Sequence, residues 1–273
     1  MRNIGMLLSY DGTAYSGYQT QPGRDTIQGR IEEAIHMLTK EHAAVTASGR
    51  TDAGVHALGQ VVNFATESSI PIERWCAAMN SRLPDDIVIR DAWEAPESFH
   101  ARFSAKRKTY RYSILAERTR DVFRRNVEFH HPAPLDIEAM RQALQHFVGE
   151  HDFTSVASPK SPKLTNVRTI YEARLEHEPN ANQEPGRGRI HLFVTGNGFL
   201  YNMVRIIAGT LIWVGEGKFS PDDIVPILAA KNREAAGPTA VPHGLTLWSV
   251  EYDGEDRMDK AAPVLAEGKK DLA

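Results

Sequence analysis

The 273-residue sequence contains a single cysteine, and its first residues show no export signal. A lone thiol, Cys76, excludes an intramolecular disulfide and every zinc site built from several cysteines. The first apolar stretch reaches a turn at Asp11-Gly12 and lacks a small-residue cleavage site. These absences predict a cytoplasmic protein. Long apolar runs are missing too, because Asn202 and Arg205 interrupt the longest one, at residues 199–214. A membrane-spanning helix needs about 20 apolar residues, so we expect no membrane span.

Motifs for metals and nucleotide cofactors are also absent. Eleven histidines are present, but no two of them lie four positions apart on a helix beside a third carboxylate ligand. The glycine pairs at 186–188 and 196–198 lack the following glycine and lysine of a phosphate-binding loop. We therefore expect no metal and no cofactor, in a globular protein of ordinary composition with 41% apolar and 25% charged residues.

Charge is distributed unevenly along the chain, whose net charge is −3. Residues 251–273 carry seven acids and four bases, a balance of −3. Residues 101–125 carry Glu117 and Asp121 against nine bases, a balance of +7: Arg102, Lys106, Arg107, Lys108, Arg111, Arg118, Arg120, Arg124 and Arg125. Such a segment can attract a polyanion. The alternative is a solvated strand face.

The hydrophobic patterns mix strands and helices without a strict βαβ rhythm, which favours an α+β fold with a largely antiparallel sheet. Strands are predicted at 4–10, 60–65, 87–93, 108–115, 167–176, 190–195 and 246–252, and helices at 27–38, 71–81, 135–147, 199–214 and after Ser220. Because the second part of the chain repeats the predicted strands and helices of the first in a similar order, we predict two similar α+β halves, 1–104 and 105–253. Helices would pack on the sheet, and an active-site cleft would lie between the halves. Residues 254–273 read as a polar, disordered tail.

Asp52 is the first candidate for chemistry. It lies in a loop between Gly49 and Gly54, where the backbone can take positive φ and approach a ligand. Arg50, two positions earlier, would favour the ionised carboxylate by lowering its pKa. An ionised aspartate can act as nucleophile, general base or metal ligand. The alternative is an Asx-turn, in which the carboxylate only accepts backbone N–H groups.

Arg205 is the only formally charged residue from Ile190 to Gly215, and it lies in a predicted apolar helix. A guanidinium cannot be buried without a partner, so Arg205 must pair with a carboxylate or reach solvent. If the two halves face each other across a cleft, Asp52 is its natural partner. The alternative is that the long side chain extends to the surface.

Two tyrosines lie in a row of bases, KRKTYRY. Strand alternation places Tyr110 and Tyr112 on one face, and we expect Lys108 and Arg111 near its rim. Aromatic rings beside cations suit an unstacked base and its phosphates. The alternative is that both tyrosines are half-buried core residues.

Several segments, in order, resemble the TruA family of tRNA pseudouridine synthases: YDGTAYSGYQTQP, TIQGRIEEAI, GRTDAGVHALGQVVNF, FHARFSAKRKTYRY, GEHDFTS and GNGFLYNMVRIIAGTL. They extend from Tyr10 to Leu211, and GLTLWSVEY near the end also fits. One departure is Tyr18, where many relatives carry tryptophan or phenylalanine.

The resemblance implies an isomerase that converts uridine to pseudouridine in the anticodon stem-loop of tRNA, typically at positions 38, 39 and 40, without a cofactor or metal. By the same resemblance, Asp52 is the nucleophile, Tyr110 stacks on the flipped base, Arg205 pairs with the carboxylate and Arg50 helps to hold the nucleotide. A homodimer that binds one tRNA across both subunits is also implied.

Two other classes of function compete with this interpretation. An RNA-binding or chaperone module could fold in the same way without catalysis, although simple binding does not need an ion pair in a cleft. A metal-dependent hydrolase could use Asp52 and His56 with Asp85 or Asp86. Sensitivity to chelators would distinguish the hydrolase.

Overall fold

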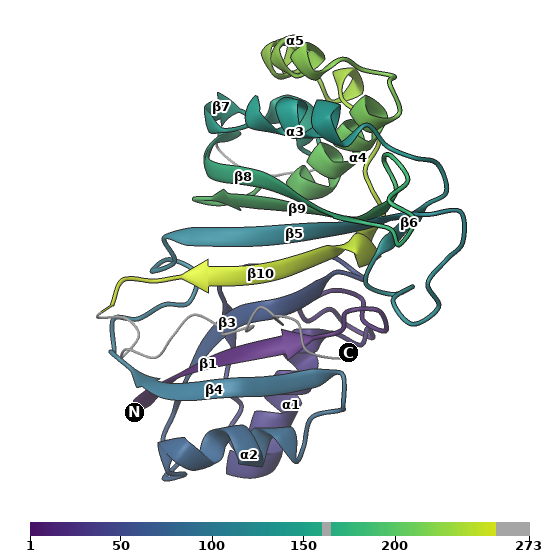
Figure 1. Cartoon of the computed structure of the whole chain (residues 1–273). Helices are drawn as coiled ribbons and strands as arrows, with labels where there is room; N and C mark the ends of the chain where they lie inside the picture. The colour runs from purple at the N-terminus through teal and green to yellow at the C-terminus, as the bar shows by residue number, and fades with distance from the viewer. Residues whose placement is uncertain (160–164, 255–273) are drawn as a thin grey trace.

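A computed structural model of the chain describes residues 1–159 and 165–254. One sheet of ten strands carries two groups of helices, as Figure 1 shows. The strands are β1 (Arg2–Tyr10), β2 (Thr46–Ala47), β3 (His56–Thr66), β4 (Ile87–Ala95), β5 (Arg107–Ala116), β6 (Phe129–His131), β7 (Gly149–Asp152), β8 (Val167–Pro179), β9 (Gly188–Gly196) and β10 (Leu245–Glu251). The helices are α1 (Ile27–Thr39), α2 (Trp75–Asn80), α3 (Ile137–Gln145), α4 (Met203–Gly215) and α5 (Ile224–Ala230). The predicted α+β class is confirmed.

The strands of the sheet run in the order β4-β1-β3-β10-β5-β9-β8-β7. β1 lies between β4 and β3, β5 lies between β10 and β9, and all four of these pairings are antiparallel. The two sets of strands meet where β3 and β10 pair in parallel, with Thr246 opposite His56. The sheet is therefore continuous across this seam, and the loop that carries Asp52 enters β3 at the seam.

Helix α1 shows why the sequence pattern predicts the element well. The Thr26 hydroxyl accepts a hydrogen bond from the Gly29 N–H at 3.3 Å and so caps the helix. Ile27, Ile31 and Ile35 then recur at helical spacing and are buried against the sheet.

Helix α4 begins four residues later than predicted, at Met203 instead of residue 199. Asn202 adopts a left-handed conformation with φ of 62°, which cannot continue a right-handed helix. Phe199 in this turn packs against Tyr110. Hydrophobicity alone cannot separate a buried helix from a buried turn, because both require apolar residues. None of the helices within the described ranges is both long and apolar enough to cross a membrane.

Tyr18 provides a test of how the core tolerates a polar atom. Its side chain is 2% exposed, and its buried hydroxyl has no hydrogen-bond partner among the described residues. Because a buried unpaired hydroxyl costs free energy, Tyr18→Phe should raise the free energy of unfolding by about 1 kcal/mol, measured by urea denaturation. Tyr10→Phe is the matched control, since the Tyr10 hydroxyl bonds to Thr51 at 2.8 Å, and it should lower that free energy by about 1 kcal/mol. A loss of stability in Tyr18→Phe would contradict the assignment.

Candidate functional site

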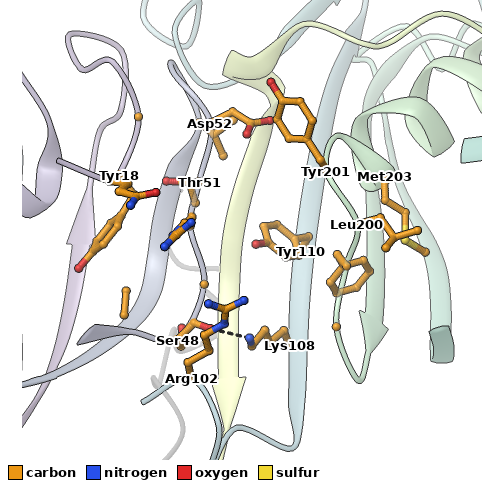
Figure 2. A pocket seen from close by; sticks show the side chains of 18 of the residues that line it. Tyr18, Ser48, Thr51, Asp52, Arg102, Lys108, Tyr110, Leu200, Tyr201 and Met203 are labelled. Carbon is orange, nitrogen blue, oxygen red and sulfur yellow. Dashed lines mark hydrogen bonds between the residues drawn. The ribbon is translucent and has the colours of Figure 1, made fainter. Parts of the chain in front are cut away.

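A cleft of about 1160 Å³ lies over the seam of the sheet. One wall comes from residues 16–28 and 45–55, and the other from residues 167–168 and 197–205 (Figure 2). Residues 108–110 lie in the floor, and the turn at 100–103 lies at one end. Its described lining contains one acid, Asp52, and five bases: Arg50, Arg102, Lys108, Arg168 and Arg205. The balance of formal charge is 5 − 1 = +4, although the whole chain carries −3. The cleft is therefore locally attractive to an anion.

Asp52 and Arg205 form an ion pair in this cleft. The guanidinium donates from Nη1 to the Asp52 carboxylate at 3.2 Å and from Nε to the carbonyl of Ala240 at 2.8 Å. The side chains of Asp52 and Arg205 are only 28% and 16% exposed. Arg205 does not extend to the surface. Nor is there an Asx-turn, because within residues 1–159 and 165–254 the Asp52 carboxylate accepts no backbone N–H.

A buried network holds the loop from Ser48 to Thr51, immediately before Asp52. Gln60, on β3, accepts from the Ser48 hydroxyl at 2.6 Å and donates to the carbonyl of Gly49 at 2.7 Å. The Thr51 hydroxyl bonds to that of Tyr10 on β1 at 2.8 Å. Burial raises the pKa of Tyr10 to about 12, so it remains a protonated phenol at neutral pH. Two strands of the sheet thus fix the backbone that carries Asp52.

The turn before α4 orients Arg205. Asn202, in its left-handed conformation, accepts from Nη1 of Arg205 at 3.0 Å. The guanidinium is therefore held by a side-chain amide and the Ala240 carbonyl as well as by Asp52. Sequence reasoning did not identify Asn202, Gln60 or Tyr10, although an asparagine one turn before the lone arginine was a visible signal.

Burial determines the ionisation of Asp52. Loss of solvent raises the pKa of the carboxyl above its ordinary value, and the Arg205 charge and hydrogen bond oppose this without reversing it. The expectation that Arg50 would lower this pKa is not supported, because burial and Arg205 account for the shift. Since the folded-state pKa is raised, ionisation of Asp52 costs the fold stability as the pH rises through that pKa. Arg205 limits this cost.

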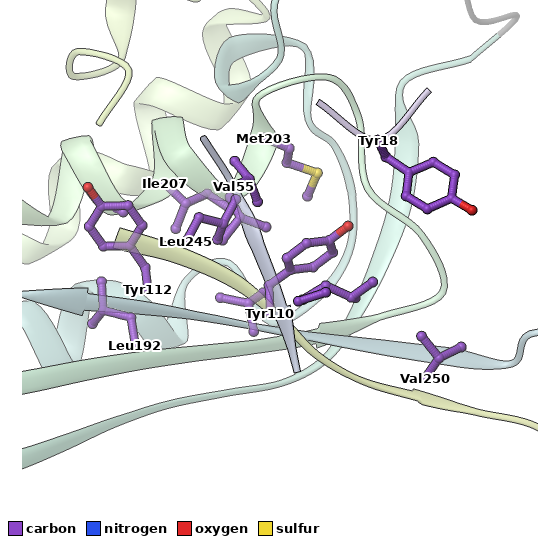
Figure 3. Packing of buried hydrophobic residues seen from close by; sticks show 14 of the residues in the cluster. Tyr18, Val55, Tyr110, Tyr112, Leu192, Met203, Ile207, Leu245 and Val250 are labelled. Atoms are coloured by element: carbon purple, nitrogen blue, oxygen red, sulfur yellow. The ribbon is translucent and has the colours of Figure 1, made fainter. Parts of the chain in front are cut away.

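Tyr110 lies in the floor of the cleft and is 9% exposed. Its ring meets Phe199 edge-on, with centroids 5.1 Å apart. Figure 3 shows Tyr110 and Tyr112 projecting from the same side of β5, as predicted from alternation. Tyr112 is fully buried and donates to the carbonyl of Val241 at 3.0 Å, so it belongs to the core. Of the two rings, only Tyr110 lines the cleft.

The basic side chains of β5 lie on different faces of the sheet. Lys108 donates to the carbonyl of Ser48 at 2.5 Å and lines the cleft. Arg111 instead lies on the opposite face, where its guanidinium carbon is 4.2 Å from the centroid of the Trp248 ring. The expectation that Arg111 would lie near the rim beside Tyr110 was wrong, because adjacent strand residues face opposite sides. Arg50 is exposed on the other wall of the cleft.

The residues suggested for a metal-dependent hydrolase form hydrogen bonds and ion pairs with different partners. Nδ1 of His56 accepts a hydrogen bond from the Gly12 N–H at 3.0 Å and lies 3.1 Å from a carboxylate oxygen of Asp11. Asp86 accepts from the Tyr15 hydroxyl at 2.5 Å. In the part of the chain that the structure describes, no three His, Cys, Asp or Glu side chains form a group suited to a metal ion.

Comparison with known proteins identifies the family. A family model described as tRNA pseudouridine synthase matches residues 6–104 and 143–253. The chain belongs to the tRNA pseudouridine synthase family. It is 52% identical over 253 residues to tRNA pseudouridine synthase A of Geobacillus sp. strain WCH70, covering 92% of this chain and 99% of that protein. It is 50% identical over 248 residues to tRNA pseudouridine synthase A of Bacillus subtilis strain 168, covering 90% and 97%. The predicted resemblance is thereby confirmed, and with it the reaction class, isomerisation of uridine in tRNA.

The buried network beneath Asp52 leads to a stability prediction. Gln60→Leu should lower the free energy of unfolding by about 2 to 3 kcal/mol, because it leaves buried polar groups of Ser48 and Gly49 without their partner. Urea denaturation measures the change. Gln145→Leu is the control, since that exposed amide makes one hydrogen bond, to Ala173, and its loss should cost less than about 1 kcal/mol. Equal effects of the two substitutions would mean that the network does not hold the loop.

Proposed function

We propose that this member of the tRNA pseudouridine synthase family isomerises uridine to pseudouridine in the anticodon stem-loop of tRNA, at positions 38 to 40. Asp52 is the nucleophile, and the reaction uses neither a cofactor nor a metal. The observation that supports this most strongly is the Asp52–Arg205 ion pair in a cleft with a net positive lining. Such a pair supplies an anionic oxygen at a place that attracts a polyanion.

The reaction conserves every atom of the nucleotide. The N1–C1′ bond breaks, the uracil rotates and C5 bonds to C1′; C5 then loses its proton and N1 gains one. Three routes are compatible with an ionised Asp52: attack at C6 of the ring, attack at C1′ of the ribose, or removal of the C2′ proton to give a glycal. Each requires the carboxylate form, which Arg205 favours against the effect of burial.

A uracil can rotate only outside the helical stack, and its extrusion costs roughly a few kcal/mol. The proposed stacking partner is Tyr110, whose ring Phe199 holds edge-on so that a base can lie against it. Stacking of one base contributes about 1 to 3 kcal/mol. Arg50, exposed on the opposite wall, is proposed to hold the extruded nucleotide through its phosphate. Together these contacts can offset the cost of extrusion.

The proposed assembly rests on the same resemblance, and the proposed location rests on the prediction made from the sequence. The proposed active form is a homodimer in which one tRNA contacts both subunits, and it acts in the cytoplasm, where tRNA is modified. Sedimentation of the protein with and without tRNA measures the stoichiometry directly.

The first test is the activity of Asp52→Asn. The protein is incubated with unmodified tRNA, and pseudouridine is mapped by carbodiimide modification and primer extension. We expect Asp52→Asn to form no pseudouridine while its affinity for tRNA stays within about tenfold of the original, because the carboxylate acts in chemistry more than in binding. Asp85→Asn, which alters an exposed acid outside the cleft, is the control and should retain full activity.

Each rival function makes a different prediction in the same assay. A metal-dependent hydrolase would lose activity in the presence of a chelator, and an RNA-binding module would form no pseudouridine in any variant. Turnover by Asp52→Asn would contradict the role of the carboxylate.

The second test is the pH dependence of kcat/KM. Burial raises the pKa of Asp52, so the acid limb of the profile should lie above the ordinary range of an aspartate, about 3.9. Arg205→Gln removes the charge that lowers this pKa, and the limb should therefore move to higher pH. Arg205→Lys keeps a positive charge and should move the limb less. An acid limb at the same pH in all three proteins would show that Arg205 does not control the ionisation of Asp52.

A further inference from the structure

A short turn from His100 to Ser104 lies at the far end of the cleft from Asp52. Figure 2 shows Arg102 at that end, beside Ser48 and Lys108, with Asp52 at the opposite end. His100, Arg102 and Phe103 all line the cleft. This turn has no role in the mechanism described above.

The turn is well held by its own hydrogen bonds. Nδ1 of His100 accepts from the backbone N–H groups of Arg102 and Phe103 at 3.2 and 3.3 Å. The Ser104 N–H donates to the His100 carbonyl at 2.9 Å, and the Ser104 hydroxyl accepts from the His100 N–H at 3.2 Å. These hydrogen bonds therefore fix the backbone that carries Phe103.

Phe103 is 77% exposed although it is a large apolar side chain. Its ring lies on that of His100, with centroids 4.2 Å apart and planes inclined by 31°. His100 thus covers one face of the ring, and the other face remains open. The guanidinium carbon of Arg102 lies 5.9 Å from the ring centroid, so a cation lies close to this ring. An ordered aromatic face beside an arginine is the arrangement with which proteins bind unpaired nucleotides.

We propose that the His100–Ser104 turn is a second RNA-binding subsite, which stacks a nucleotide flanking the target uridine on Phe103 and contacts its phosphate through Arg102. The inference rests on the proposed function, because it assumes that the cleft holds an RNA strand. The positive lining between this turn and Asp52 favours RNA over a second copy of the chain, which carries a net charge of −3. A single exposed ring among charged neighbours also suits one base better than a protein surface.

The test compares affinities for unmodified tRNA by filter binding at two salt concentrations. Phe103→Ala should raise the Kd by about fivefold to hundredfold, and Phe103→Trp, which keeps an aromatic face, should restore most of the affinity. Arg102→Gln should raise the Kd and reduce the slope of log Kd against log salt by about one. Phe123→Ala is the matched control, because Phe123 is 94% exposed near Arg124 but lies outside the cleft lining, and its Kd should not change.

A second measurement locates the contact. 4-Thiouridine is placed beside the target uridine in the tRNA, and its photochemical crosslink to the protein is mapped by mass spectrometry. We expect the crosslink at Phe103 or its neighbours in the turn, and its loss in Phe103→Ala.

The outcomes separate this inference from the proposed function. If the unaltered protein forms pseudouridine but Phe103→Ala binds tRNA as Phe123→Ala does, the subsite is wrong and the function stands. A change in sedimentation of Phe103→Ala without RNA would show that a second copy covers the ring, which also overturns the subsite. If the unaltered protein forms no pseudouridine, the proposed function itself fails.

Discussion

Asp52 and Arg205 are 153 positions apart in the chain, and they meet because β3 and β10 pair at the seam of the sheet. Asp52 precedes β3, while Arg205 on α4 is tied to the segment before β10 through the carbonyl of Ala240. Neither charge could be buried alone, since an unpaired ion in a poorly solvated cleft is prohibitively costly. The pair therefore couples the relative position of the two sets of strands to the ionisation of the carboxylate.

The surroundings of this pair divide into rigid and open parts. Below Asp52, Gln60 holds the backbone of the loop at Gly49, and Tyr10 on the neighbouring strand bonds to the Thr51 hydroxyl. Asn202 holds the guanidinium from the turn before α4. Above them the cleft is open and lined with bases. A site that must admit a nucleotide cannot be closed on all sides. The functional side chains must therefore be positioned by the residues packed beneath them. The cleft lining carries more bases than acids although the net charge of the chain is negative, so its attraction for RNA is local.

Sequence reasoning predicted features that depend on local pattern or on a charge without a local partner. The spacing of apolar residues at 27–38 predicts the buried face of α1. Arg205 is the single charge in an apolar helix, and this predicted that it has a charged partner. What it missed depends on tertiary register. Gln60 reaches the loop only through the strand pairing, and the left-handed Asn202 makes the start of the apolar run a turn instead of a helix. The direction of the Asp52 pKa shift is a balance between burial and one nearby charge, and only coordinates can weigh them.

In the proposed mechanism, an isomerisation that consumes nothing places a particular demand on the carboxylate. A well-hydrated carboxylate ionises easily but is a weak nucleophile, because water stabilises its charge; a dry one is more reactive but resists ionisation. Asp52 lies between these limits, since burial raises its pKa while Arg205 opposes that rise. Because Nε of Arg205 is bound to Ala240 and Nη1 is shared with Asn202, the guanidinium is held independently of the carboxylate. The counterion of the proposed nucleophile is therefore held in the cleft by contacts that do not involve Asp52, an arrangement that a purely structural ion pair does not need.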